Sequence, residues 1–387
     1  MKLNDIFKTI KKSTGAEELE KSTLAKPTDY LSTGNYAINR VLTGDIHKGF
    51  PVGRISCIAG ASQSGKSLLV ANTIINALKE DKVDHIFIFD SEGGVLVDYF
   101  KKANIDMSKI QHIPVISLEE CAVKMLNVYD TLIKAKQDYE KDPDNNDDVR
   151  VLCVLDSIGA LSSDKLITDA VKKDQMVADM GSSAKLRNNL MRGLMMRVPV
   201  SGATLLIVNH IYDDPSAGMF GVSKIKQMGG GKGLEYSSHV ILQCEKLLVK
   251  SNNTDYITGL EDKSDVDEGN FYKGNRLRFF VVKNRIAKPA FQATIYLDFD
   301  RGYNKWDGLI EDSVRWGYIN EVRGGYIVPT YSDKRVTHKE LITNDDIFNS
   351  FIDEFNKKSI EKMSYSNSTT KQLDEIETEL VDDVILD

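Results

Sequence analysis

A short run of glycine, serine and lysine carries the clearest chemistry in the sequence. Residues 60–67 read GASQSGKS and match the pattern GxxxxGK[ST]. In such a loop the backbone N–H groups turn inward as a nest for phosphate, the lysine reaches the β- and γ-phosphates, and the final hydroxyl binds Mg²⁺. The apolar segment ISCIA before the motif and the helical pattern SLLVANTIINAL after it disfavour a chance match. The residues predicted to bind nucleotide here are Gly60, Ser62, Ser64, Gly65, Lys66, Ser67 and Leu68, and Lys66 is also expected to act in catalysis.

Two carboxylates follow apolar, strand-like segments and complete the expected phosphate chemistry. Asp156 ends the segment VLCVLD and suits a residue that holds the metal together with Ser67. Many buried strands end in aspartate, so this interpretation depends on the phosphate-binding motif upstream. Glu92, in IFIFDSEGG, is predicted to orient the water that attacks the γ-phosphate, the alternative being a solvated turn carboxylate. Asp90 is a candidate for orienting or for support on the metal side.

The segment LLIVNH brings Asn209 and His210 to the polar end of another apolar strand. Open α/β sheets place ligand-sensing groups at such strand ends. A lone histidine at a strand end is more often structural than functional, so the residues alone leave both readings open for His210.

Strands and helices must alternate to position these groups. Nearly continuous apolar runs predict strands at 54–59, 86–89, 151–155, 204–208 and 240–243, with helical patterns at 67–79, 118–136 and 184–198. This order indicates an α/β fold with a mostly parallel sheet covered by helices on both faces. Further β-like runs at 276–282 and 292–297 extend the sheet, and polar loops are expected at 141–148 and 251–268.

Composition limits the class of protein. The 387 residues carry a formal net charge of −7, with 41% hydrophobic and 28% charged residues, which is ordinary for a soluble globular protein and excludes wholesale disorder or a histone-like coat of positive charge. The last seventeen residues hold seven acids against one base and so account for about −6 of that charge. Isolated cysteines, the absence of an apolar leader and the absence of a membrane span predict a cytoplasmic protein without a membrane partner.

These motifs, in this order and with the turn STG at 32–34 before them, resemble the RecA family of strand-exchange ATPases, most closely its phage UvsX-type members. The resemblance rests on DSE around Glu92, LDSIGAL at Asp156, Met180-Gly181, MGGGKG at 228–233 and VVKNRIAKPAFQA from 281, and covers about residues 30–330. It implies a RecA-like ATPase core that uses ATP and Mg²⁺ and forms helical filaments on single-stranded DNA.

The resemblance also implies roles for individual residues at the nucleotide. Tyr99 occupies the position that stacks on adenine, and His210 that of the sensor coupling the γ-phosphate to a DNA-binding loop. Lys283 and Arg285 match basic residues that reach across the subunit interface to the neighbour's ATP. At position 235, bacterial members often have a lysine that takes part in contacts across the subunit interface. This sequence has Glu235 instead, so that contact does not carry over by the resemblance.

Two DNA-binding loops carry over by the same resemblance, around 162–180 and 211–232. Met180 matches a residue that wedges between base triplets, and glycine amides in the second loop match groups that approach phosphate. The residues implied in DNA binding are Met180, Lys185, Arg192, Lys224, Lys226, Gly230, Gly231 and Lys232. Acid-free basic stretches at 224–232 and 271–288 agree with contacts to a nucleic-acid backbone, although a charge run is usually a solvated face.

We expect four segments along the chain. Residues 1–29 form an amphipathic helix and linker, which folds back onto its own core or docks on a neighbouring subunit; 30–302 form the ATPase core; 303–365 form a small C-terminal α/β domain; and 366–387 form an acidic tail. Family analogy suggests that this tail competes with DNA for the basic surface.

The function implied is an ATP-dependent recombinase that acts on single- and double-stranded DNA as a homo-oligomer, either helical filament or ring. A single-strand-binding protein and a loading mediator are expected partners. The resemblance also implies that the protein works in the bacterial cytosol and is encoded by a phage. The alternatives are a hexameric RecA-fold replicative helicase and a non-catalytic ATP-binding mediator. A helicase core usually has a Gly-Pro turn after its KxR motif, whereas IAKP follows Arg285 here, which disfavours the first alternative. The second is disfavoured because a mediator needs no water-orienting residue, and this chain has Glu92 together with Lys66, Ser67 and Asp156.

Overall fold

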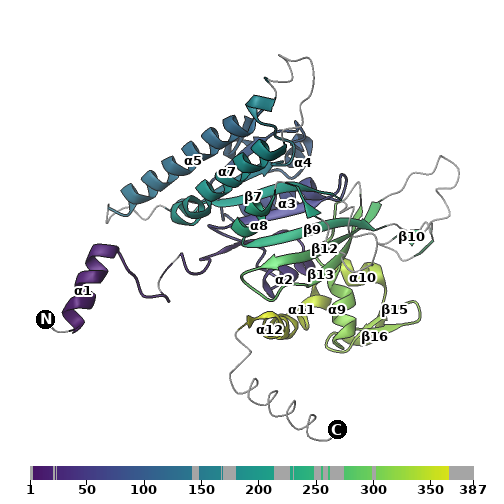
Figure 1. The fold of residues 1–387 in the computed structure, drawn as a ribbon. Helices are drawn as coiled ribbons and strands as arrows, with labels where there is room; N and C mark the ends of the chain where they lie inside the picture. The colour runs from purple at the N-terminus through teal and green to yellow at the C-terminus, as the bar shows by residue number, and fades with distance from the viewer. Residues whose placement is uncertain are drawn as a thin grey trace, which may run out of the picture.

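The fold is that of a computed structural model. It describes residues 3–20, 22, 24–141, 148–166, 168, 180–212, 227–229, 231–247, 254–255, 260–261, 274–298 and 302–365. Figure 1 shows a twisted central sheet with helices packed on both of its faces and a smaller group of elements at the C-terminal end.

The large sheet has the strand order β13-β12-β9-β3-β7-β6-β4-β5, and β8 pairs with β7 off this path. Its strands are β3 (Ile55–Gly60), β4 (His85–Asp90), β5 (Ile110–Pro114), β6 (Val151–Asp156), β7 (Thr204–Tyr212), β8 (Gln227–Met228), β9 (Val240–Leu247), β12 (Gly274–Asn284) and β13 (Gln292–Asp298). The stretch from β9 to β5 is parallel, whereas β12 and β13 join it antiparallel. The predicted, mostly parallel sheet is confirmed, and β5 is an edge strand that the apolar pattern did not indicate.

Helices cover both faces because successive strand residues point to opposite sides. On β3, Ile58 packs with α2 (Tyr36–Thr43), α3 (Lys66–Lys79) and α4 (Val97–Lys102), while Cys57 and Ala59 pack toward α5 (Leu118–Tyr139) and α7 (Met180–Ser201). A short helix, α8 (Lys232–Ser237), contributes Leu234 to the second cluster. The double coverage explains why these strands read as continuous apolar runs.

The three expected helices exist, but their bounds differ. Helix α3 begins one residue earlier than predicted, at Lys66, and α5 continues to Tyr139. Helix α7 starts at Met180 and runs to Ser201 with Pro199 inside its last turn, so it is longer at both ends than the expected 184–198.

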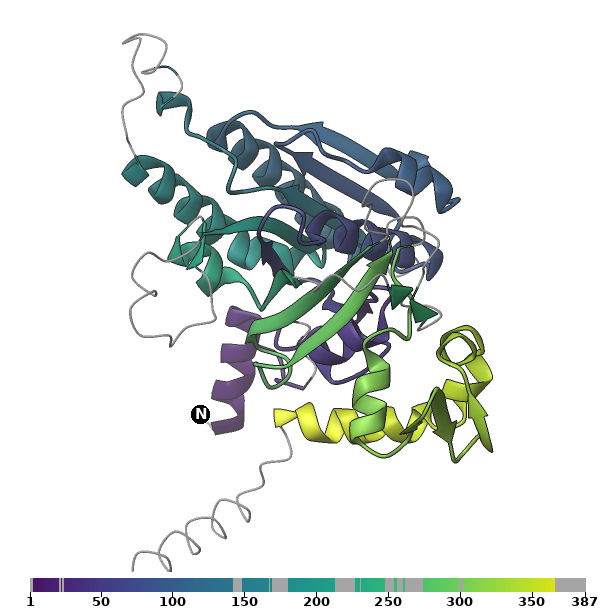
Figure 2. The same ribbon diagram turned by 90° about the vertical axis from the view of Figure 1, so that its right-hand side faces the viewer.

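The C-terminal elements form a third hydrophobic cluster. They are α9 (Leu309–Arg315), β14 (Asn320–Val322), β15 (Gly325–Val328), β16 (Ser332–Val336), α10 (His338–Thr343), α11 (Asp345–Asn349) and α12 (Ile352–Met363). Trp306 stacks on Phe348 with ring centroids 4.2 Å apart. Ile46 belongs to this cluster, and Arg40 of α2 forms a buried ion pair with Asp312, so the region is anchored to the core. Figure 2 shows the yellow elements at the end of the molecule remote from α5 and α7.

Short elements complete the described chain. Strands β1 (Tyr30–Leu31) and β2 (Phe50–Pro51) pair with each other, as do β10 (Thr254–Asp255) and β11 (Leu260–Glu261), and a single 3-10 turn, η1, spans Met107–Lys109. Among the described helices, none combines the length and the apolar character needed to cross a lipid bilayer.

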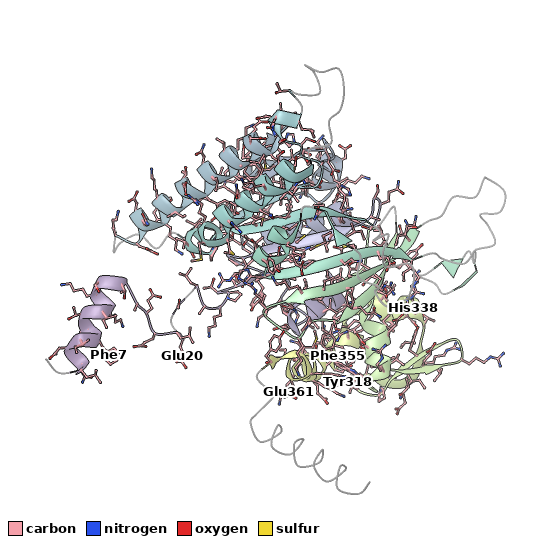
Figure 3. The ribbon with its side chains drawn as sticks, in the orientation of Figure 1. Phe7, Glu20, Tyr318, His338, Phe355 and Glu361 are labelled. Atoms are coloured by element: carbon pink, nitrogen blue, oxygen red, sulfur yellow. The ribbon has the colours of Figure 1, made fainter. Side chains whose placement is uncertain are left out.

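The N-terminal helix is α1 (Leu3–Thr14), as predicted, and it buries none of its residues. Its apolar side chains Leu3, Ile6, Phe7 and Ile10 are all exposed. Figure 1 draws α1 apart from the sheet, and Figure 3 labels Phe7 on it, well away from the body of the molecule. In this single chain, α1 does not fold back onto its own core.

Candidate nucleotide site

The phosphate-binding loop joins β3 to α3, as the motif requires. Gly65 has a φ of +86°, and a Cβ at this position would lie 2.5 Å from Cδ1 of Leu277. Only glycine suits both the backbone conformation and the space. Within the described part of the chain, the buried Ser64 hydroxyl has no hydrogen-bond partner. Ser62 is exposed and Leu68 is half-buried beside the loop.

Lys66 is buried beneath the loop. Its Nζ donates hydrogen bonds to the carbonyl oxygens of Gly60, at 3.0 Å, and Ala61, at 2.7 Å. Burial lowers the pKa of Lys66, while the nearby Cys244, Asp156 and Glu92 act in the opposite direction. The ammonium group is therefore held by the rim of the loop, at the place where phosphate oxygens would supply better partners.

Ser67 and Asp156 meet at the carboxyl end of the sheet. The Ser67 hydroxyl lies 3.4 Å from Oδ2 of Asp156. Burial, and then the charges of Glu92 and Asp90, raise the pKa of Asp156 to about 6. A buried carboxylate beside other acids is a good partner for a cation. No group of three acidic, histidine or cysteine side chains in the described residues forms a closed metal cage. These oxygen donors fit Mg²⁺, which commonly takes a few protein ligands together with waters and substrate phosphates.

Glu92 and His210, predicted separately, form a direct contact. Oε1 of Glu92 lies 2.9 Å from Nε2 of His210 and also accepts a hydrogen bond from the Ser157 hydroxyl. Burial would raise the pKa of Glu92, but these two hydrogen bonds, with the charges of His210 and Lys66, lower it overall. Glu92 is thus held as a carboxylate next to the phosphate-binding loop.

Strand order explains why these groups converge. Strands β4, β6 and β7 are parallel neighbours, so their carboxyl ends lie together. Glu92 and Ser157 follow β4 and β6, and His210 lies near the end of β7, so the three residues meet at that end of the sheet. Ser157 is a residue that the sequence reasoning did not single out; its position directly after Asp156 was the available signal.

His210 is also linked to the short strand β8. Its carbonyl oxygen accepts a hydrogen bond from the N–H of Gly229 at 2.9 Å, and Nδ2 of Asn209 donates to the carbonyl of Gly229 at 2.5 Å. Strand β8 lies within the predicted second DNA loop, 211–232. One histidine therefore contacts Glu92 through its side chain and this loop through its backbone.

Tyr99 lies on α4 and is half-buried. Its hydroxyl donates to Oδ1 of Asn72 at 2.8 Å, and a Cβ at Gly302 would lie 3.4 Å from the same hydroxyl oxygen. Burial raises the pKa of Tyr99, so the phenol is neutral. The ring is fixed by α3, which carries the phosphate-binding residues at its start.

Lys283 and Arg285 contact α8. Nζ of Lys283 donates to the carbonyl oxygens of Glu235 at 2.5 Å and Tyr236 at 3.2 Å, and Arg285 donates to the Tyr236 carbonyl at 3.1 Å. These cations complement the C-terminal end of the helix. Burial, and then the charge of Arg285, lower the pKa of Lys283, while Glu235 raises it. Their predicted reach to a neighbour's ATP stays a prediction.

The predicted DNA-binding residues are only partly described. Lys185 and Arg192 are exposed on α7, and Gly231 and Lys232 are exposed at the start of α8. Asn188 of α7 joins the two helices, because its Oδ1 accepts the N–H of Gly233 at 3.0 Å. The side chain of Met180, residues Lys224, Lys226 and Gly230, much of both loops, and the acidic tail lie outside the described residues.

The sequence is similar to those of known proteins. A family model described as the RecA N-terminal domain matches residues 1–304. The chain is 26% identical over 328 residues to a recombination and repair protein of Enterobacteria phage T4, covering 84% of this chain and 74% of that protein. It is 28% identical over 306 residues to Protein RecA of Aquifex aeolicus, covering 79% and 75% respectively. A Protein RecA of Nocardioides is 24% identical over 364 residues, with 91% of this chain covered and 88% of the relative.

Proposed function

This chain belongs to the RecA family, and on that premise we propose that it is an ATP-dependent recombinase of DNA recombination and repair. In this proposal it assembles as a filament on single-stranded DNA and catalyses homologous pairing and strand exchange. The observation that carries the proposal is the connection from Glu92 through His210 to Gly229. It joins the residue proposed to act in hydrolysis to the segment proposed to bind DNA.

The phosphates of ATP are expected to rest on residues 60–67. Lys66 would leave the carbonyl groups of Gly60 and Ala61 for the β- and γ-phosphate oxygens, which are stronger acceptors. Ser67 and Asp156 are the residues that would hold Mg²⁺, which supplies charge neutralisation on the phosphates. Tyr99 would stack on the adenine ring.

Glu92 is proposed to orient the attacking water. Its carboxylate accepts a hydrogen bond from the water and takes up its proton, while the water oxygen bonds to the γ-phosphorus and the bond from that phosphorus to the leaving phosphate oxygen breaks. Because Oε1 of Glu92 is held by Ser157 and His210, the second carboxylate oxygen is available for that water. His210 would transmit a change at the γ-phosphate to β8.

The complete site is proposed to form between subunits of a homo-oligomer. Lys283 and Arg285 of one subunit would reach the ATP of the next, where they would neutralise phosphate charge only in the assembled state. This assignment requires them to exchange the carbonyl groups of α8 for phosphate oxygens. The exposed apolar side of α1 is the proposed docking element.

The proposed DNA surface combines Lys185, Arg192 and Lys232 with the residues assigned to the two loops. Contacts to the backbone of single- and double-stranded DNA would be independent of sequence and sensitive to salt. A single-strand-binding protein and a loading mediator are proposed partners, and the bacterial cytosol, with phage origin, is the proposed setting.

A strand-exchange assay with Lys66→Ala and Glu92→Gln tests the proposal. We expect the wild-type protein to exchange strands and to form filaments visible by electron microscopy. Lys66→Ala should lose both activities, whereas Glu92→Gln should lose hydrolysis and retain filaments. Unwinding of forked DNA without strand exchange would support the helicase alternative, and absence of ATP hydrolysis would support the mediator alternative.

A further inference from the structure

The turn that carries Glu92 is held by a residue outside the proposed reaction. Oδ1 of Asp90, at the end of β4, accepts the backbone N–H of Glu92 at 2.9 Å and that of Gly93 at 2.8 Å. The Asp90 side chain is 3% exposed. The orientation of the Asp90 carboxylate therefore fixes the position of the Glu92 backbone. Ser157 and His210 hold the Glu92 side chain separately, at its carboxylate end.

The other oxygen of Asp90 is held by a histidine. Nε2 of His112 lies 3.0 Å from Oδ2 of Asp90. His112 belongs to the edge strand β5, which pairs with β4 so that His112 faces Ile88 in the register. Its side chain is 53% exposed, so the contact forms at the rim of the sheet.

The chemistry of Asp90 determines what His112 contributes. Burial would raise the pKa of Asp90, but hydrogen bonds from the Glu92 N–H, His112 and the Gly93 N–H lower it overall. An ionised carboxylate only accepts hydrogen bonds, so Nε2 of His112 carries the hydrogen. Both the neutral ring and the imidazolium can provide this donor, and the contact does not require a charged histidine.

We propose that His112 and Asp90 form a positioning pair that fixes the turn bearing Glu92 and so places its carboxylate for hydrolysis. This inference rests on the proposed function. Within the described residues, the polar contact of the His112 side chain is to Asp90 and not to a residue assigned to the nucleotide or to the attacking water. His112 therefore acts through Asp90. Without the donor, one oxygen of a nearly inaccessible carboxylate loses its partner, and Asp90 can rotate away from the two N–H groups.

The consequence should appear in turnover and not in nucleotide binding. The phosphate-binding loop and Tyr99 belong to other segments, whereas the direction of Glu92 depends on this turn. A small displacement of a catalytic group can cost one to two orders of magnitude in rate. A residue needed only for folding would instead lower stability and activity together.

Three single-residue variants separate these cases in the full-length protein. His112→Phe keeps a planar ring and removes the donor; His112→Gln places an amide N–H near the position of Nε2. His85→Phe is the matched control, because His85 is exposed at the opposite end of β4. Single-stranded-DNA-stimulated ATP hydrolysis gives kcat and KM, titration with a fluorescent ATP analogue gives affinity, and thermal melting monitors the fold.

We expect His112→Phe to lower kcat about tenfold, with KM and analogue affinity changed less than about twofold. His112→Gln should recover most of the rate, and His85→Phe should match the wild type. Equal kcat values for wild type, His112→Phe and His112→Gln would overturn the inference while leaving the proposed function intact. A wild-type protein without DNA-stimulated hydrolysis would instead overturn the proposed function, and the inference with it.

A double-mutant cycle provides a second test that does not depend on rescue. Asp90→Asn retains the shape of the side chain but weakens both sets of contacts. If the pair acts as one unit, adding His112→Phe to Asp90→Asn should lower kcat no further. Additive losses in the double variant would contradict a shared action through Asp90.

Discussion

Individual acidic side chains at the carboxyl end of the sheet have pKa values shifted away from their ordinary range, and not all in the same direction. Asp156 is the clearest case, since burial and the charges of Glu92 and Asp90 raise its pKa to about 6. Glu92 and Asp90, in contrast, have lowered pKa values because hydrogen bonds outweigh their burial. The cluster therefore keeps Asp156 poised to gain most from a nearby cation.

Asp156→Asn should stabilise the nucleotide-free protein while abolishing hydrolysis. The folded chain favours the protonated form of Asp156. Protonated Asp156 therefore costs the wild type no stability below about pH 4, and the wild type loses stability as the pH rises through about 6 and Asp156 ionises. The free energy of unfolding of the variant should exceed that of the wild type by about 1–3 kcal/mol at pH 8, and the difference should vanish near pH 4. Urea unfolding at both pH values measures the difference. A variant that is less stable than the wild type at pH 8 would contradict a raised pKa for Asp156.

Gly65→Ala should weaken ATP binding at least tenfold. The substitution combines a φ of +86° with a clash against Leu277, together costing roughly 1–3 kcal/mol in the bound loop. Gly15→Ala is the control, because Gly15 has a similar φ of +66° and open space around its Cβ position. Titration with a fluorescent ATP analogue distinguishes them, and equal affinities would show that the loop tolerates a side chain.

At the scale of elements, the parallel order of β4, β6 and β7 creates the site, and α7 and α8 carry the exposed bases of the proposed DNA surface. Asn188 fixes these two helices relative to each other through the N–H of Gly233. A Cβ at Gly233 would lie 3.0 Å from Cγ of Asn188, so the helix contact leaves little room. The spacing between Lys185 and Lys232 therefore depends on this one hydrogen bond and the packing around it.

Asn188→Ala should weaken single-stranded DNA binding about fivefold while ATP affinity is unchanged. One neutral hydrogen bond contributes about 1 kcal/mol, and its loss lets α8 move relative to α7. Asn189→Ala is a neighbouring control, since Asn189 is exposed on the same helix. Fluorescence anisotropy with a labelled oligonucleotide compares the two; identical losses would mean that the α7–α8 contact does not position the bases.

Many of the strands, and several of the site residues that they carry, were predictable from the sequence, and the exceptions have physical causes. Strands such as β3 and β6 are buried on both faces and are therefore continuous apolar runs. The edge strand β5, IQHIP, is half-exposed and ends in proline, so it has no such run. The phosphate-binding motif predicted Lys66 and Ser67, and the end of the apolar segment VLCVLD predicted Asp156. The contacts of Ser157 and His112 depend on strand register, which neither pattern specifies.

At the scale of the whole molecule, the single chain presents surfaces that call for partners. Helix α1 exposes its apolar side, on which the side chain of Phe7, for example, is 60% exposed. The net charge of −7 does not oppose DNA binding, because about −6 of it belongs to residues 371–387. None of the residues of α1 is buried against its own core, which makes this helix the element we propose for docking on a second copy of the chain.

Phe7→Ser should impair filament assembly without lowering the stability of the monomer. Burying a phenylalanine against a neighbouring subunit contributes about 1.5–3 kcal/mol, so the concentration needed for filaments should rise at least tenfold. Lys8→Ser, at the next and also exposed position, should have little effect. Light scattering with ATP and single-stranded DNA measures assembly, and normal filaments from Phe7→Ser would exclude this side of α1 as the docking element.

The rate of ATP hydrolysis with and without single-stranded DNA, measured for the wild type and Glu92→Gln, tests the central claim most directly. We predict hydrolysis that rises at least tenfold on adding single-stranded DNA and a loss of at least a hundredfold in Glu92→Gln, in line with removal of a water-orienting base. A wild-type rate that ignores DNA, or full turnover by Glu92→Gln, would contradict the account.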